Sequence, residues 1–367
     1  NYIVNEQGRQ DHVANTMPSP YYRFDGSDDK IATAHSAHLD ITTNDFSVEA
    51  YIRTPDSFSM DMYLLNKYED GDNEWLLYYG NSQSKLYFVS KVGGVIFGNY
   101  LSDASVLTAG KNHHIVFTSD RDGTKGQFYL NGVAITTTES TVMNAASHAN
   151  SGGLEFGVNG ANEVVIPAYY KASVHNHALS AAEVKELYSG ASVPFKYKGA
   201  NQTAVLTNDF SSSSGWTAQA GWAVTGGAGV GTDVADGNKL YRDGGLTIGK
   251  RYRATCSVSA YTDGSVALYG DGGNVDLENQ GELSATGTMV GEWTCTAAGN
   301  VGVLSKTAGS DLSVDDFSIV QIGAVAEYDG SSAGAHQWGD KSGNELHGTV
   351  GDGAGGASAP TLENTPY

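Results

Sequence analysis

The chain has 367 residues and 47 glycines, almost twice the ordinary glycine share of roughly 7%, and only 17% charged residues, which excludes a coiled coil and disfavours a helical bundle. A hydrophobic fraction of 40% is enough to build cores. The formal charge of −20 and the lack of any run of 18 apolar residues predict that the protein binds no nucleic acid and inserts into no membrane.

Residues 1–17 are polar and aperiodic, so we predict an N-terminal arm or linker there. From residue 21 onwards, short apolar runs alternate with polar residues, which is typical of half-buried strands. The predicted strands of this first region are 46–53, 75–79, 85–89, 114–118 and 127–130. The pair Asn131-Gly132 directly follows the last run and predicts a type I′ hairpin, because both residues tolerate positive φ.

One short helix is predicted near 181–189. Ser180 and Glu183 form a capping box at its start, and Gly190 is placed to take the left-handed position after its end. Its apolar stripe comprises Val184, Leu187 and Tyr188. Pro194 then marks a boundary, so the first domain is predicted to span 18–194.

A second strand-rich domain is predicted over 195–323, with its clearest strands at 251–259 and 312–320. The fold class is therefore all-β, built of tandem antiparallel β-sandwich (jelly-roll) domains. The remaining segment 324–367 is rich in glycine, so we predict that it is more similar to a linker than to a part of a folded core. It is expected to depend on neighbours for its order, with Trp338 and Leu346 buried against another domain or subunit.

Four segments in this order and spacing resemble a laminin-G-type, concanavalin-A-like jelly roll over about residues 18–192. They are YYRFDGSDDKI (21–31), FSVEAYIR (46–53), HHIVFTSD with GQFYLNG (113–132) and HALSAAEVKELY (177–188). The resemblance implies two stacked antiparallel sheets and often glycan binding at one rim. It does not imply an enzyme.

The second domain is similar to a CenC-like carbohydrate-binding module, another jelly roll. The residues that carry this resemblance are NDFSSSSGW (208–216), GWAV (221–224), LTIGKRYRATCSVSAYTDGSVAL (246–268) and LSVDDFSIVQIG (312–323). The whole arrangement resembles tail-associated and fibre proteins of tailed bacteriophages. It implies a non-enzymatic structural component of the virion, a tail, fibre or surface decoration protein that attaches to host-surface glycans.

On that resemblance, the partners would be other virion proteins and copies of the chain itself, on particles assembled in the host cytoplasm. Phage fibres are typically homotrimers, yet the sequence carries no triple-helical or coiled-coil signature. A secreted or cell-surface bacterial glycan-binding protein is the alternative, and a glycoside hydrolase is a third reading.

Hydrolysis on this fold requires paired carboxylates on one strand, as in E-x-D-x-E. No such run occurs, and the carboxylates Glu49 and Glu163 stand alone, so we predict that they are solvated and that the chain has no catalytic residues.

Two histidine pairs, His113-His114 and His175-x-His177, lack a third ligand and are predicted to be ordinary surface residues rather than a zinc site. Cys256 and Cys295 are predicted to face inward and to stay reduced.

No cofactor is required, but calcium is possible. Asp25, Asp28 and Asp29 crowd one loop of the first domain. The resemblance implies an acidic pair ahead of the helix, where Lys171 and Ser173 stand instead. In the second domain, the resemblance implies a structural calcium between the first and last strands, and its candidate ligands are Asp209 and Asp315.

Aromatic side chains are the best candidates for glycan binding, because sugar rings stack on their faces. The candidates are Trp75, Tyr78 and Tyr79 in the first domain and Trp216, Trp222, Tyr241 and Tyr261 in the second. The alternative is that these residues belong to sandwich cores, since Trp75, Leu77 and Tyr79 alternate as a core face would.

Overall fold

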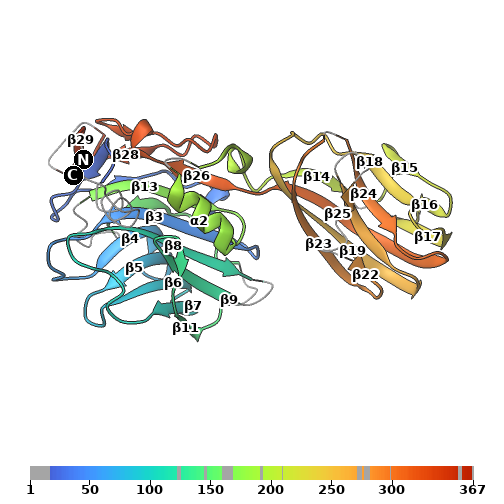
Figure 1. The fold of residues 1–367 in the computed structure, drawn as a ribbon, viewed down its shortest axis with the longest axis horizontal. Helices are drawn as coiled ribbons and strands as arrows, with labels where there is room; N and C mark the ends of the chain where they lie inside the picture. Colours follow the sequence, from blue (N-terminus) through green and yellow to red (C-terminus); the bar gives the residue numbers. More distant parts are fainter. Residues whose placement is uncertain are drawn as a thin grey trace, which may run out of the picture. The chain divides into compact units, whose positions relative to one another are not determined.

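The protein was analysed in a computed structural model (Figure 1). It describes residues 17–121, 125–143, 147–158, 168–190, 193–208, 210–270, 275–276, 282–297, 299–353 and 358–365. The chain forms two compact units: unit 1 comprises Asn1–Pro194 and Ala324–Tyr367, and unit 2 comprises Phe195–Gly323. The predicted arm 1–17 lies outside the described residues except for Met17, which is buried. None of the described helices is long and apolar enough to cross a membrane.

Unit 1 is a sandwich of two antiparallel sheets. Over the described residues, the eight-stranded sheet has the order β10 (Val133–Ala134), β9 (Lys125–Leu130), β8 (Asn112–Asp120), β3 (Phe46–Arg53), β13 (Ala168–His175), β1 (Tyr21–Arg23) and β29 (Thr361–Glu363), and β26 (Ala324–Tyr328) also pairs with β13. The second sheet has nine strands: β11 (Thr137–Thr141), β7 (Val95–Ser102), β6 (Lys85–Val92), β5 (Asn73–Gly80), β4 (Met62–Asp70), β12 (Gly153–Phe156), β2 (Ile31–Ala32), β28 (Gly348–Val350) and β27 (Gln337–Trp338).

Local sequence signals of unit 1 are reproduced in the structure. Asn131 and Gly132 have φ values of 51° and 78° between β9 and β10, which confirms the predicted hairpin. Helix α2 (Ala181–Ser189) is the one α-helix in the described part of the chain, and both bonds of its predicted capping box are present. Gly190 is extended, with φ −104° and ψ 147°, so the predicted left-handed end is wrong.

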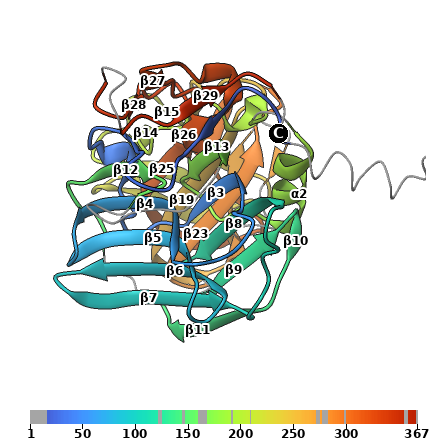
Figure 2. The ribbon, with the colours of Figure 1, turned by 90° about the vertical axis from the view of Figure 1, so that its left-hand side faces the viewer.

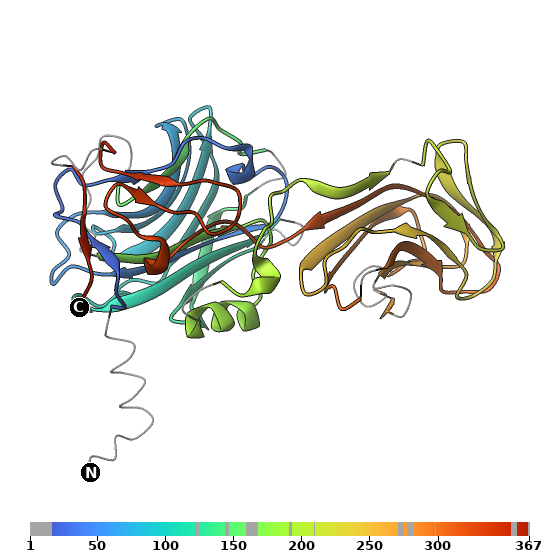
Figure 3. The ribbon, with the colours of Figure 1, turned by 90° about the horizontal axis from the view of Figure 1, so that it is seen from above.

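Helix α2 lies on the outer side of the eight-stranded sheet, away from β4 to β7 (Figures 2 and 3). Val184 and Leu187 are buried against the sheet, as the predicted stripe requires. Tyr188 is half-buried, and its ring lies 5.5 Å from that of His114 on β8. The helix therefore covers the second face of β3, β8 and β13, so this sheet is buried on both sides here.

The segment 324–367, read from the sequence as more linker than core, supplies strands to both sheets of unit 1. Its strands β26, β28 and β29 pair with β13, β2 and β1. Trp338 is fully buried, with its ring 5.2 Å from the rings of Tyr22 and Phe156. Leu346 is 8% exposed. Because β13, β2 and β1, which pair with β26, β28 and β29, are more than a hundred residues away in the sequence, no local sequence pattern predicts these pairings.

Unit 2 is a second antiparallel sandwich. In its described part, one sheet comprises β16 (Trp222–Thr225), β17 (Ala228–Val234), β25 (Ser310–Gln321), β19 (Arg251–Asp263) and β23 (Gly287–Thr294), with β14 (Ala204–Asn208) beside β25. The other comprises β15 (Trp216–Ala218), β18 (Lys239–Asp243), β24 (Asn300–Ser305), β20 (Val266–Gly270) and β21 (Val275–Asp276), with β22 (Glu282–Leu283) beside β20.

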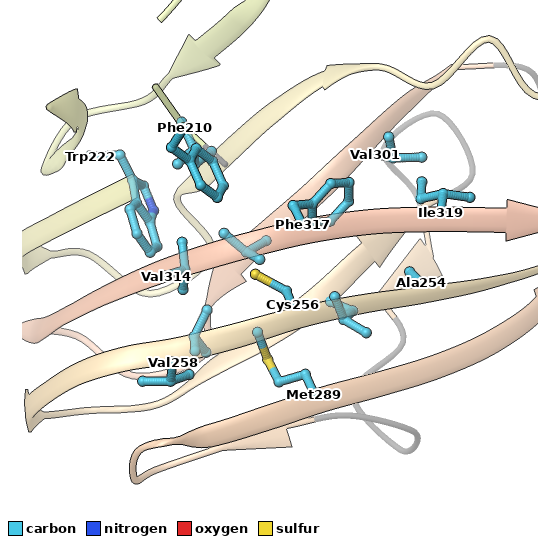
Figure 4. Packing of buried hydrophobic residues seen from close by; sticks show 14 of the residues in the cluster. Phe210, Trp222, Ala254, Cys256, Val258, Met289, Val301, Val314, Phe317 and Ile319 are labelled. Atoms are coloured by element: carbon cyan, nitrogen blue, oxygen red, sulfur yellow. The ribbon is translucent and has the colours of Figure 1, made fainter. Parts of the chain in front are cut away.

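The core of unit 2 lies between its sheets and includes Cys256, Val314 and Phe317 (Figure 4). Cys256 and Cys295 are both buried and free, as predicted for reduced thiols. Burial raises the pKa of Cys256, which keeps the thiol protonated. Two such sandwiches with a single short α-helix in the described residues confirm the all-β fold class with tandem sandwiches.

Candidate functional site

Three tyrosines form a row across the outer face of the nine-stranded sheet. Tyr63 on β4 lies opposite Tyr78 on β5, and Tyr78 lies opposite Tyr87 on β6. The rings of Tyr78 and Tyr87 are stacked, with centroids 4.9 Å apart and planes 12° apart, and the Tyr63 ring lies 5.6 Å from that of Tyr78. We call Tyr63, Tyr78 and Tyr87 the tyrosine row.

The two-residue period of β5 explains why Tyr78 belongs to this face. Trp75 and Tyr79 are 0% and 1% exposed and point into the sandwich, so the alternate residue Tyr78 points out. Tyr63 and Tyr78 are half-buried. Gly80 leaves room for the row, because a Cβ there would lie 2.8 Å from the Tyr87 ring. The result is an aromatic strip that spans three adjacent strands.

A second row on the same face is polar at one end. Asn66 on β4 lies opposite both Leu76 on β5 and Glu155 on β12. The Asn66 Nδ2 atom donates to Glu155 Oε2 at 3.1 Å, which fixes the orientation of the amide. The Asn66 Oδ1 atom is buried and accepts no hydrogen bond in the described structure. This oxygen is an acceptor without a donor.

A third row holds an ion pair. Glu74 on β5 lies opposite Lys91 on β6, and Glu74 Oε1 is 2.5 Å from Lys91 Nζ. Glu74 is only 3% exposed, and its Oε2 atom is buried with no hydrogen-bond partner in the described structure. Unpaired buried carboxylate oxygens are costly, so this atom is a second acceptor that requires a donor.

Burial raises the pKa of Tyr78, and the neighbouring Tyr87, Asp61, Tyr63 and Glu74 raise it further. The phenol therefore stays protonated at neutral pH and can donate a hydrogen bond. Chemically, this face combines aromatic rings, which stack on the C–H faces of sugars, with a phenol that can donate a hydrogen bond to a sugar oxygen. These are the two kinds of contact that a glycan-binding surface needs.

Sequence reasoning found Tyr78 but missed Tyr63 and Tyr87. The strand pattern of KLYFV in 85–89 carried the signal for Tyr87, because Leu86 and Phe88 are the inward residues. Tyr63 could not be aligned with Tyr78 from the sequence, since β4 has a bulge between Tyr63 and Leu65 that shifts its register. The row exists only once the pairing of the three strands is known.

The other predicted aromatic residues do not gather at one place. In unit 1, Trp75 and Tyr79 are core residues whose ring faces are covered. In unit 2, Trp222 is buried and donates from Nε1 to the Asn238 carbonyl, whereas Trp216 packs on Phe210 at 4.7 Å. Tyr241 is half-buried, with its ring 6.5 Å from that of Tyr269, and the Tyr261 hydroxyl donates to the Gly264 carbonyl.

Glu49, predicted to be solvated, is completely buried beneath helix α2. Its Oε1 atom is 2.7 Å from Lys171 Nζ and 2.7 Å from His114 Nε2, and Ser173 Oγ donates to Oε2. Burial alone would raise the pKa of Glu49, but the Lys171 ammonium and the hydrogen bonds from His114 and His175 outweigh it and hold the pKa well below its ordinary range.

The predicted surface histidines are also buried. The exposed fractions of His113, His114, His175 and His177 are 5%, 1%, 0% and 0%. His114 and His175 belong to the cluster around Glu49, and His113 lies 3.0 Å from the Thr108 carbonyl through Nε2. For His114 and His175 the prediction failed because helix α2 covers the second face of β3, β8 and β13, whereas His113 lies on the opposite face of β8. On this face, Lys171 forms an ion pair with Glu49 and Ser173 donates a hydrogen bond to it.

The predicted calcium ligands are only partly described. Asp209 lies outside the described residues, and Asp315 Oδ1 accepts the backbone N–H of Asp316. The calcium prediction therefore stays a prediction. In unit 1, the carboxylates of Asp25, Asp28 and Asp29 lie within 4.8 Å of one another. Two of their oxygens already accept backbone N–H groups of the same loop.

Residues 25–185 match the family model of the concanavalin A-like lectin/glucanases superfamily, Laminin_G_3. This part of unit 1 is therefore similar to concanavalin A-like lectin domains. No curated protein matches the sequence.

Several solved structures are similar to part of the chain. A Trypanosoma rangeli sialidase is 14% identical over 47% of this chain and 28% of its own, with a TM-score of 0.34. A proposed carbohydrate-binding protein from Bacteroides ovatus is 15% identical over 47% of each chain, with a TM-score of 0.35. The CBM40 of a Ruminococcus gnavus sialidase, bound to α2,3-sialyllactose, is 14% identical over 44% of this chain and all of its own, with a TM-score of 0.33. Similarities this low assign no function.

Proposed function

We propose that the chain is a non-enzymatic glycan-binding protein and that the tyrosine row of unit 1 is its binding surface. The observation that carries the proposal is the stacked pair Tyr78 and Tyr87, extended by Tyr63 across a third strand. Tyr63 and Tyr78 are half-buried and Tyr87 is 8% exposed, so the accessible part of the row lies over β4 and β5. The Tyr78 phenol stays protonated, so it can donate a hydrogen bond to a sugar oxygen.

The test is a glycan array with the full chain, followed by calorimetric titration of the best ligand. Replacing Tyr78 with Ala should weaken binding several-fold to about tenfold, because aromatic stacking contributes about 0.5–1.5 kcal/mol. Tyr78→Phe keeps the ring and should retain most of the affinity. Tyr241→Ala in unit 2 is the matched control and should leave binding unchanged. Loss of binding on Tyr241→Ala but not on Tyr78→Ala would move the site to unit 2.

The setting we propose is the surface of a phage virion, where the chain would be a tail, fibre or decoration protein assembled in the host cytoplasm. This rests on the resemblance in domain order that the sequence shows. Several copies on one particle would convert weak sugar contacts into firm attachment through effective concentration. Mass spectrometry of purified virions would detect the chain as a structural component. Its absence from virions, together with its presence on a bacterial surface, would favour a cell-surface glycan-binding protein instead.

A further inference from the structure

Lys67, Asp40 and Asn150 bring together, inside unit 1, the three groups that an amide-forming reaction needs: an amine, a carboxylate and a carboxamide. We propose that the side chains of Lys67 and Asn150 are joined by an intramolecular isopeptide bond and that Asp40 carries the proton in its formation. The inference goes beyond the proposed glycan binding, because it concerns a covalent modification of the chain itself.

The three side chains meet at the Lys67 amine. Lys67 Nζ lies 2.8 Å from Asp40 Oδ1 and 2.8 Å from Asn150 Oδ1, and it also donates to the Asn150 carbonyl. Lys67 is on β4, Asp40 follows the short 3-10 helix η1 (Ala37–Leu39), and Asn150 precedes β12. Because β12 pairs with β4, with Leu154 opposite Lys67, the fold holds Asn150 beside the amine.

The surroundings of Lys67 favour an uncharged amine, which is the form that attacks a carbonyl carbon. Lys67 lies opposite Trp75 on β5 and Leu154 on β12, and all three residues are 0% exposed. Burial lowers the pKa of Lys67, because the ammonium loses its water, and the contact with Asp40 offsets only part of this effect. Asp40 Oδ1 is within hydrogen-bond distance of Nζ, so it is placed to accept the proton.

The Asn150 carboxamide is held as the group that is attacked. Its Oδ1 atom accepts hydrogen bonds from Lys67 Nζ and, at 3.0 Å, from the Gly152 N–H. The backbone donor stabilises the negative charge that develops on this oxygen when an amine adds to Cγ. Gly152 is fixed in turn, because a Cβ there would lie 2.0 Å from the Tyr68 carbonyl oxygen. Asn150 is only half-buried, so ammonia released from it can reach the solvent.

The reaction balances without a further reactant and neither oxidises nor reduces any group. The Lys67 ammonium gives a proton to Asp40, and the neutral Nζ attacks Cγ of Asn150 to form a tetrahedral intermediate with its negative charge on Oδ1. Asp40 relays a second proton from Nζ to Nδ2, the C=O bond re-forms, and the Cγ–Nδ2 bond breaks. The departing ammonia takes up the proton first given to Asp40, so the products are the Nζ–Cγ amide, the Asp40 carboxylate and ammonium.

The bond ties β4 to the loop ahead of β12, between residues that are 83 positions apart in the sequence. A cross-link of this length restricts the unfolded chain as a disulfide that closes a long loop does. Unlike a disulfide, an amide is not opened by reducing agents. The cross-link therefore stabilises unit 1 in oxidising and reducing surroundings alike.

Mass spectrometry of the full chain, purified in its folded form, tests the proposal. We expect the intact mass to be lower than the sequence mass by one ammonia, about 17 Da. A complete protease digest should contain a linked pair of peptides, with Lys67 in one and Asn150 in the other. Succinimide formation at Asn131-Gly132 would also release ammonia, so the linked pair and not the intact mass decides. A digest without that pair would overturn the inference.

Variants test the role of each group. Lys67→Arg keeps a cation beside Asp40 but has no amine, so its digest should contain no linked pair and its Tm should fall. Asp40→Asn keeps a hydrogen-bond acceptor but cannot take up the proton, so the linked fraction at a fixed time after synthesis should fall at least about tenfold. Lys125→Arg, at an exposed lysine of β9, is the matched control and should form the bond in full. An undiminished linked fraction in Asp40→Asn would overturn the assignment of proton transfer to Asp40, and the digest of the native chain decides on the bond itself even if a variant does not fold.

Discussion

Glu49 on β3 and Lys171 on β13 form an ion pair of 2.7 Å inside unit 1, and both side chains are buried under helix α2. Breaking a buried pair from one side leaves an unpaired charge and typically costs 3–5 kcal/mol, whereas replacing both partners costs far less. We therefore expect Lys171→Met to lower the free energy of unfolding of unit 1 by about 3–5 kcal/mol.

Urea denaturation measures this effect. Lys185→Met, which alters an exposed lysine of helix α2, should be close to neutral. The double variant Glu49→Gln with Lys171→Met should be more stable than the sum of the two single losses predicts. A Lys171→Met loss no larger than that of Lys185→Met would show that the Glu49 charge is satisfied without Lys171.

The stability losses caused by substitutions at two positions of helix α2, its cap and its buried face, can be compared. Ser180 caps the helix and Leu187 is 1% exposed. Ser180→Ala removes one cap and should cost about 1 kcal/mol, while Leu187→Ala leaves a cavity and should cost roughly 2–5 kcal/mol. Chemical denaturation of both variants gives the ranking. Equal losses would mean that Leu187 contributes little packing beneath the helix.

Features formed by residues close together in the sequence could be predicted, whereas contacts between residues far apart in the sequence could not. The capping box of Ser180 and Glu183 spans three residues, and the Asn131-Gly132 turn is shorter still, so both could be predicted. Glu49 pairs with Lys171 across 122 residues, a contact that no local pattern encodes. The tyrosine row was found only in part, because its register depends on a bulge in β4. Strand parity indicated the outward face of Tyr78 but not which aromatic residues lie beside it.

His148 makes the stability of unit 1 depend on pH. It is 2% exposed, its Nδ1 atom lies 2.6 Å from Ser90 Oγ, and burial together with Arg121 lowers its pKa to about 4. The unfolded chain binds a proton near pH 6.5 and the folded chain does not, so the contribution of His148 is complete above about pH 6.5 and is lost as the pH falls toward 4.

Over this window the loss amounts to about 3 kcal/mol, at about 1.4 kcal/mol per unit of pH. Measuring the free energy of unfolding between pH 4 and 7 should show this rise for the native chain. His148→Asn keeps a hydrogen-bonding group near Ser90 but cannot titrate, so its curve should be flatter by that amount. Parallel curves for the two proteins would contradict a neutral buried His148.

Trp338 tests whether the C-terminal segment is an integral part of unit 1. Its ring is fully buried among aromatic rings, and its Nε1 atom donates to the Asp329 carbonyl at 2.9 Å. Trp338→Ala should destabilise unit 1 by about 3–5 kcal/mol through the cavity that it leaves. Because unit 2 is a separate compact unit inserted between Pro194 and Ala324, calorimetry should show two transitions, of which only one shifts. Phe317→Ala in the core of unit 2 should move the other transition. If Trp338→Ala moved neither transition, or only the one that Phe317→Ala moves, the segment would not close the sandwich of unit 1.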